Sequence, residues 1–179
     1  GSDIDGEGSY DESGISVSLS SDGSVVAIGA RYNDGGGSNS GHVRIYENDN
    51  GTWTQIGSDI DGESSSDYSG SSVSLSADGS VVAIGAYAND GGGGNSGHVR
   101  IYENNNGTWT QIGSDIDGEG SSDHSGFSVS LSSDGSVVAI GAYANDGGGG
   151  DSGHVRVYYD MGRTTLSFTT LDNVAPTLS

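Results

Sequence analysis

The sequence repeats one unit three times. The copies begin at Gly1, Gly57 and Gly113, so the period is 56 residues. The first two copies align without gaps and differ at nine positions. A period of this length is typical of proteins in which each repeat is one supersecondary unit that buries its apolar face by stacking on its neighbours. The repeat therefore constrains the fold more than any other feature.

Each unit contains four segments with the pattern of β-strands. In the first unit, residues 16–20 alternate polar and apolar side chains, and residues 24–30 are a continuous apolar run. The alternation predicts a half-buried strand, and the apolar run predicts a strand covered on both faces. Residues 41–47 and 52–56 follow, and Asp-Gly and Asn-Gly turns separate the members of each pair. Since no helical periodicity is present, we expect an all-β fold of tandem four-stranded antiparallel blades, as in a β-propeller.

The repeat also predicts the domain organisation. The expected blades are residues 1–56, 57–112 and 113–171, with a C-terminal tail or linker at 172–179. The third copy lacks the tryptophan strand, and we expect 164–171 either to replace it or to pair with another chain. Propellers typically close with about 4–8 blades. Three blades therefore predict a partial propeller or one completed by self-association, as a homo-oligomer or a filament.

The charge of the chain is strongly acidic. Five arginines and no lysine face 25 acidic residues, which gives a net charge of −20. Nucleic acid and anionic membranes are bound by Lys and Arg, so we expect no nucleic-acid partner. No apolar run is long enough to span a bilayer, and we expect no membrane insertion. The absence of cysteine excludes disulfides and thiolate metal sites.

Short motifs in each unit carry a family resemblance. Ser13-Gly14, the run at 24–30 that ends in Gly29-Ala30, and Gly-His-Val-Arg-Ile-Tyr at 41–46 resemble the FG-GAP repeats of integrin α-subunit propellers and bacterial surface proteins. Ser-Gly stands where that family has Phe-Gly, and Gly-Ala matches its Gly-Ala-Pro without the proline. The resemblance implies an extracellular or cell-surface binding or adhesion module with a protein or glycan ligand. The alternative is a structural subunit of an extracellular filament or surface layer.

A carboxylate cluster recurs once per unit in the connection that leads into the first strand. Strand alternation places this connection on the same rim as the loop between strands two and three. Carboxylates at alternate positions, followed by a glycine in the first and third units, are typical of an EF-hand-type calcium loop. The predicted calcium ligands are Asp3, Asp5, Glu7, Asp11, Asp59, Asp61, Glu63, Asp67, Asp115, Asp117, Glu119 and Asp123.

Calcium has a competing interpretation. The twelfth position of the loop, where a bidentate glutamate is needed, holds Gly14, Gly70 or Gly126. A solvated acidic rim without an ion therefore explains the same pattern. The family resemblance implies a calcium site in the loop between strands one and two, where this chain keeps a single aspartate per unit.

The remaining polar residues are interpreted as packing residues or as variable surface positions, and not as catalytic or metal-binding residues. His42, His98 and His154 precede an arginine in the third strand of each unit; we expect a polar stripe between blades rather than metal ligands. His124 replaces Glu12 and Tyr68 and is interpreted as a variable rim position. An active site is usually one asymmetric constellation, whereas most polar features here are copied threefold, so we expect no enzyme activity.

Overall fold

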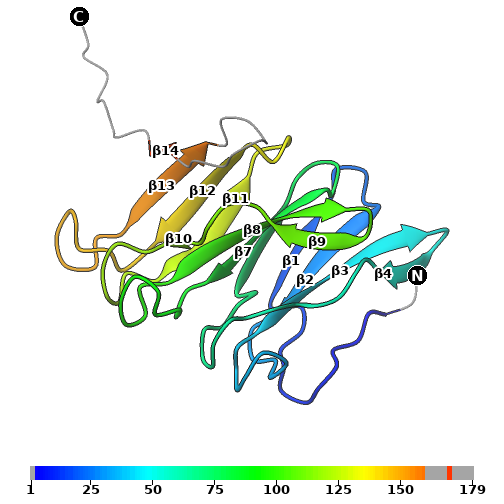
Figure 1. The fold of residues 1–179 in the computed structure, drawn as a ribbon, viewed down its shortest axis with the longest axis horizontal. Coiled ribbons are helices and arrows are strands. Elements are labelled where there is room, and N and C mark those ends of the chain that lie inside the picture. The colour runs from blue at the N-terminus through cyan, green and yellow to red at the C-terminus, as the bar shows by residue number, and fades with distance from the viewer. Residues whose placement is uncertain (1–2, 160–168, 171–179) are drawn as a thin grey trace, which may run out of the picture.

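The computed structural model describes residues 3–159 and 169–170, and it is all-β. Three antiparallel sheets, one for each unit, follow one another from blue through green to orange in Figure 1. The predicted fold class, tandem antiparallel blades of a partial propeller, is confirmed. Among the described residues, no helix is long and apolar enough to cross a membrane.

The four predicted strands of the first two units are confirmed. The first sheet has the order β1 (Ser16–Leu19), β2 (Val25–Ala30), β3 (His42–Asp49) and β4 (Thr52–Gln55). The second contains the equivalent strands β6 (Ser72–Leu75), β7 (Val81–Ala86), β8 (His98–Asn105) and β9 (Thr108–Gln111). The third contains β11 (Ser125–Leu131), β12 (Val137–Ala142) and β13 (His154–Tyr159).

The third sheet obtains its last strand from the divergent C-terminal segment. β14 (Thr169–Thr170) pairs antiparallel with β13, at Tyr158↔Thr170 and Tyr159↔Thr169. The expectation that 164–171 replaces the fourth strand is confirmed for these two residues. The other residues of that segment, and the predicted tail at 172–179, lie outside the described part of the chain.

Each of the first two sheets has a fifth strand that the sequence does not predict. β5 (Ile60–Asp61) and β10 (Ile116–Asp117) lie in the carboxylate-rich segments, which were expected to be rim connections only. β5 pairs with β3, at Val43↔Ile60, along the part of β3 that β4 does not reach. The expectation is wrong because Ile60 is buried between the sheets and draws its backbone into the ladder. The first sheet thus takes an edge strand from the second unit.

Apolar side chains fill the space between consecutive sheets. The first core joins one face of the first sheet to the second sheet, and it includes Val43, Ile45, Val73, Leu75 and Ile84. The second core repeats this arrangement between the second and third sheets. β6 lies between β1 and β11. The sheets therefore pack face to face, as propeller blades do.

Hydrogen bonds repeat at both junctions in the same register. The Ser21 amide donates to the Ala77 carbonyl at 2.8 Å, and the Ala77 amide donates to the Ser133 carbonyl at 2.8 Å. The Leu75 amide donates to Ser18 Oγ at 2.9 Å, and Leu131 repeats this bond one unit later. Equivalent positions of the repeat thus build one interface twice.

The two end faces of the stack are exposed. Val17 of the first sheet is 63% exposed, whereas its counterpart Val73 is 9% exposed against the preceding sheet. Val155 of the third sheet is 69% exposed, whereas its counterpart Val99 is fully buried. Each end presents the apolar face that an internal junction buries.

Candidate functional site

Two connections meet on one rim of each junction, as strand alternation predicts. The loop between β2 and β3 lies against the segment that leads into β6: the Gly62 amide donates to the Gly41 carbonyl at 2.7 Å, and Ser69 donates to Ser40 at 2.8 Å. The second junction repeats both bonds. The short turns lie at the opposite ends of the strands, where the Asn48 amide donates to the Ser24 carbonyl at 2.8 Å.

Three of the predicted calcium ligands stabilise these rim loops. Asp11 is buried, and its Oδ2 accepts hydrogen bonds from Asn33 Nδ2 at 2.8 Å and from the Gly8 amide at 3.1 Å. Asp67 and Asp123 accept the equivalent bonds from Asn89 and Asn145. These carboxylates tie the segment before each first strand to the following loop.

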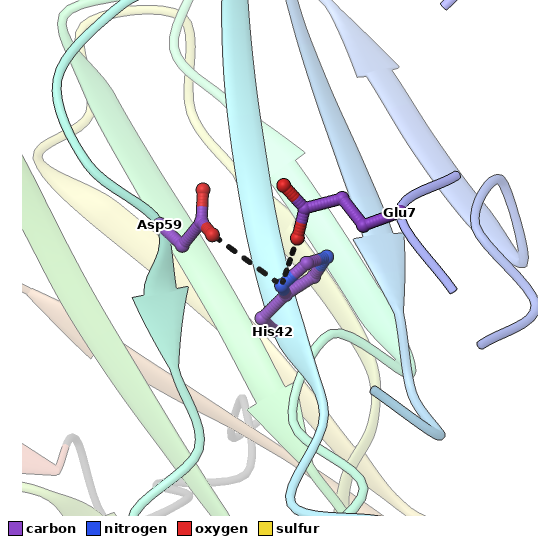
Figure 2. Close-up of side chains that lie close together, drawn as sticks. All are labelled: Glu7, His42 and Asp59. Carbon is purple, nitrogen blue, oxygen red and sulfur yellow. Dashed lines mark ion pairs between the residues drawn. The ribbon is translucent and has the colours of Figure 1, made fainter. Parts of the chain in front are cut away.

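Two other predicted ligands meet a histidine from the third strand. Nδ1 of His42 in β3 lies 3.9 Å from Glu7 Oε2 and 3.9 Å from Asp59 Oδ2. Figure 2 shows both carboxylates directed at the same ring nitrogen. Glu63, His98 and Asp115 form a copy of this group. Such a set of nitrogen and oxygen donors could hold a metal ion.

The other predicted ligands lie outside these groups. Asp5 and Asp61 contribute their backbone carbonyls, which accept hydrogen bonds from Arg44 and Arg100 at 2.7 Å. Within residues 3–159, the sets of three or more close carboxylate and histidine donors are the two groups named above. Neither contains Asp3, Asp5, Asp11, Asp61, Asp67, Asp117, Glu119 or Asp123.

Burial keeps the two histidines neutral at pH 7. It lowers the pKa of His42 below the usual 6.5, against the opposing effect of the Asp59 and Glu7 carboxylates. Burial, assisted by the Arg100 cation, lowers the pKa of His98 to about 4. Burial also raises the pKa of Glu63. The imidazoles are therefore in the state that can donate a lone pair.

The expected polar stripe between blades is present. Arg44 lies over the ring of Tyr46 at 5.6 Å and Arg100 over that of Tyr102 at 5.5 Å. The buried position of His42 agrees with the expected packing role. The sequence did not reveal that the carboxylates of two different repeats approach this histidine, because the three residues span 52 positions from Glu7 to Asp59.

A row of aromatic rings crosses all three units. Neighbouring ring centroids lie 4.7–5.7 Å apart. We call this set the aromatic row; it consists of Tyr32, Tyr68, Tyr87, His124, Phe127 and Tyr143. Phe127 and Tyr143 are about half exposed, and they line a pocket of about 420 Å³ at the end of the row.

The aromatic row occupies positions at which the units differ. Four of the nine differences between the first two units, at positions 12, 15, 31 and 32, fall on it. Tyr68 and His124 adopt left-handed backbone conformations, with φ of 57° and 56°. Non-glycine residues held in this conformation cluster at functional sites. Sequence reasoning found only the variable position of His124; comparing the differences between units could have found the rest.

Comparison with known proteins supports the family resemblance. Residues 4–46 match the FG-GAP repeat. The match contains β1, β2 and most of β3, and the resemblance predicted from the sequence is confirmed. Among curated proteins, no sequence matches the chain.

A solved structure supports the fold. The chain is similar to a Bacteroides uniformis ATCC 8492 protein named as a candidate 6-phosphogluconolactonase, with a TM-score of 0.56 and 17% sequence identity. The alignment covers 87% of this chain and 38% of that protein. The chain thus spans less than half of the longer protein's length. At this identity the likeness shows a β-propeller-like fold alone.

Proposed function

We propose that the chain is an extracellular binding or adhesion module of a cell-surface or secreted protein, and that it is not an enzyme. The FG-GAP match supports this class, because such repeats are typical of extracellular proteins. The observation that carries the proposal is the aromatic row. It is continuous across the units, partly exposed, and placed where otherwise near-identical repeats differ.

The aromatic row has the properties of a contact surface on a rigid scaffold. Aromatic side chains supply large contact areas at low cost in conformational entropy and are enriched in binding hot spots. The hydrogen-bonded rim loops hold the backbone on either side of it. The net charge of −20 favours a protein or glycan ligand that carries cationic groups.

The test is a binding screen against glycans and extracellular matrix proteins with three forms of the chain. We expect Tyr87→Ala, in the centre of the row, to weaken the binding of any ligand found by about 10-fold or more. The control is Tyr10→Ser, because Tyr10 is 91% exposed, has no ring partner in the row, and is replaced by Ser66 in the second unit. Equal binding by wild type and Tyr87→Ala, or no binding to either library, would reject the proposal.

Calcium binding by the predicted carboxylates stays a prediction. An ion that binds the folded state and not the unfolded state must raise the melting temperature of the chain. Thermal unfolding with millimolar calcium and with a chelator measures this shift directly. An unchanged melting temperature would show that the carboxylates do not bind calcium.

A second function, that of a structural subunit, is supported by the exposed end faces. Val17 and Leu19 at one end, and Val155 and Val157 at the other, are equivalent to residues that pack at the internal junctions. We propose that the end of one copy docks on the beginning of another through this same interface, closing a ring or extending a filament. The mass of the protein in solution, measured at several concentrations, tests this function.

A further inference from the structure

A buried nitrogen without a partner lies at the centre of each histidine–carboxylate group. The side chain of His42 is 1% exposed, and its Nδ1 makes no hydrogen bond. His98 Nδ1 is in the same situation. A buried polar atom left unpaired destabilises the folded state, because it has lost its hydrogen bonds to water. Because both histidines repeat this feature in the same surroundings, it calls for an explanation other than chance.

The donor atoms around each nitrogen are close enough to share one ion. In both groups all three donor atoms lie within 4.8 Å of one another. Ligands bound to a tetrahedral ion at about 2.1 Å lie roughly 3.4 Å apart. The two distances of 3.9 Å at His42 therefore need to shorten by only a fraction of an ångström. The side chains of Glu7 and Asp59 are partly exposed, which leaves them free to make this movement.

Each carboxylate is held by one oxygen and presents the other. Gln55 Nε2 donates to Asp59 Oδ1 at 2.6 Å, and Oδ2 faces the histidine. Arg44 Nη1 lies 3.6 Å from Glu7 Oε1, and Oε2 faces the histidine. Partners of this kind orient metal ligands. Gln111 repeats the first contact on Asp115 at 2.7 Å.

We propose that Glu7, His42 and Asp59 bind one divalent transition-metal ion, and that Glu63, His98 and Asp115 bind a second. Imidazole nitrogen with carboxylate oxygen suits zinc and its neighbours in the first transition series. Calcium takes six to eight oxygen ligands, so these groups suit a different ion, although their four carboxylates belong to the calcium loops predicted from the sequence. Two carboxylates outweigh the positive charge of the nearby arginine. The inference goes beyond the proposed function and does not rest on it.

Each ion would join residues of consecutive units. Glu7 and His42 belong to the first copy of the repeat and Asp59 to the second. The third copy supplies Glu119 and His154, with 3.8 Å between the carboxylate and Nδ1. Within residues 3–159, the sets that combine a histidine with two carboxylates are therefore these two.

Zinc titration of the chelator-treated chain by calorimetry tests the proposal. We expect two zinc ions per wild-type chain, one for Asp59→Asn, one for Asp115→Asn, and none for the double variant. Asp3→Asn is the matched control, since Asp3 has the same position in the repeat and belongs to neither group; it should still bind two. These aspartates are partly exposed or outside the core, and circular dichroism confirms that each variant is folded.

A second readout distinguishes zinc binding at the two proposed sites from zinc binding elsewhere on the surface. Zinc should shift the ring NMR signals of His42 and His98 and leave those of His124 unchanged. Zinc should also raise the melting temperature of wild type and of Asp3→Asn, but not that of the double variant. The proposal is overturned if wild type binds no zinc, or if the double variant binds as much zinc as Asp3→Asn.

Discussion

Single aspartates close the turns between the first two strands of each sheet. Oδ1 of Asp22 accepts hydrogen bonds from the Ser24 amide at 2.9 Å, from Ser24 Oγ at 2.7 Å and from Ser20 Oγ at 2.8 Å. These bonds, the Ser24 amide first, lower the pKa of Asp22 to about 2. The equivalent bonds in the third unit lower the pKa of Asp134 to about 2. Serine hydroxyls thus satisfy the carboxylate in the loop where the family resemblance implies calcium.

The lowered pKa values predict an acid-sensitive contribution to stability. The folded-state pKa lies below the ordinary value of 3.8, so the contribution is complete above about pH 4 and is lost as the pH falls through 2. We expect Asp22→Asn with Asp134→Asn to reduce the loss of unfolding free energy between pH 5 and pH 2. Urea unfolding at both pH values measures this loss for wild type and for the double variant. An equal loss in wild type and variant would contradict the assignment.

Local contacts of this kind are predictable from the sequence, whereas the histidine–carboxylate groups are not. Asp22 and its serine partners are two residues apart, so the Asp-Gly turn already indicates the contact. His42 approaches carboxylates 35 residues before it and 17 residues after it. That proximity depends on β5 pairing with β3 and on the packing of the N-terminal segment against Arg44.

At the scale of the elements, periodicity predicts the long strands well and the short edge strands poorly. β2 and β7 are continuous runs buried along their whole length, and alternation identifies β1 and β6. β5 contains one apolar residue, Ile60, between carboxylates, which is too short a signal for any periodicity. Tertiary burial of that residue, rather than local preference, makes the strand.

The second strand of each of the first two sheets has a glycine at the point where the next unit approaches. A Cβ at Gly85 would overlap the carbonyl oxygen of Gly126 in the next unit, whereas a Cβ at Gly141 would meet only the side chain of Ser128 within such a distance. We expect Gly85→Ala to destabilise the chain by about 1–3 kcal/mol, as overpacking does. Gly141→Ala, the same change at the same position of the repeat, should cost less. Urea unfolding compares them, and equal losses would argue against the close approach.

At the scale of the whole molecule, one interface is used at both junctions and its two halves are exposed at the ends. Val43 and Ile45 of the first unit, and Val99 and Ile101 of the second, are buried by the sheet that follows. Val155 and Val157 are their exposed equivalents. A second copy of the chain carries the matching face on β1, where Val17 and Leu19 are exposed.

These faces predict self-association of the chain. We expect the mass measured by analytical ultracentrifugation to rise with concentration, and Val155→Asp to abolish the rise because it places a charge in the apolar contact. Val155 is exposed in the single chain, so the variant should fold normally. A monomer mass that stays constant with concentration for wild type would reject the proposal that the chain is a structural subunit.

The central claim is that the units stack through one repeated interface, and amide hydrogen exchange in dilute solution tests it most directly. The Ser21 and Ala77 amides donate to the next unit, whereas Ser133 occupies the same position at the exposed end of the stack. We predict slow exchange at Ser21 and Ala77, comparable to that of the strand amides, and fast exchange at Ser133. Equally fast exchange at all three amides would show that the sheets do not pack on one another, and the account would fail.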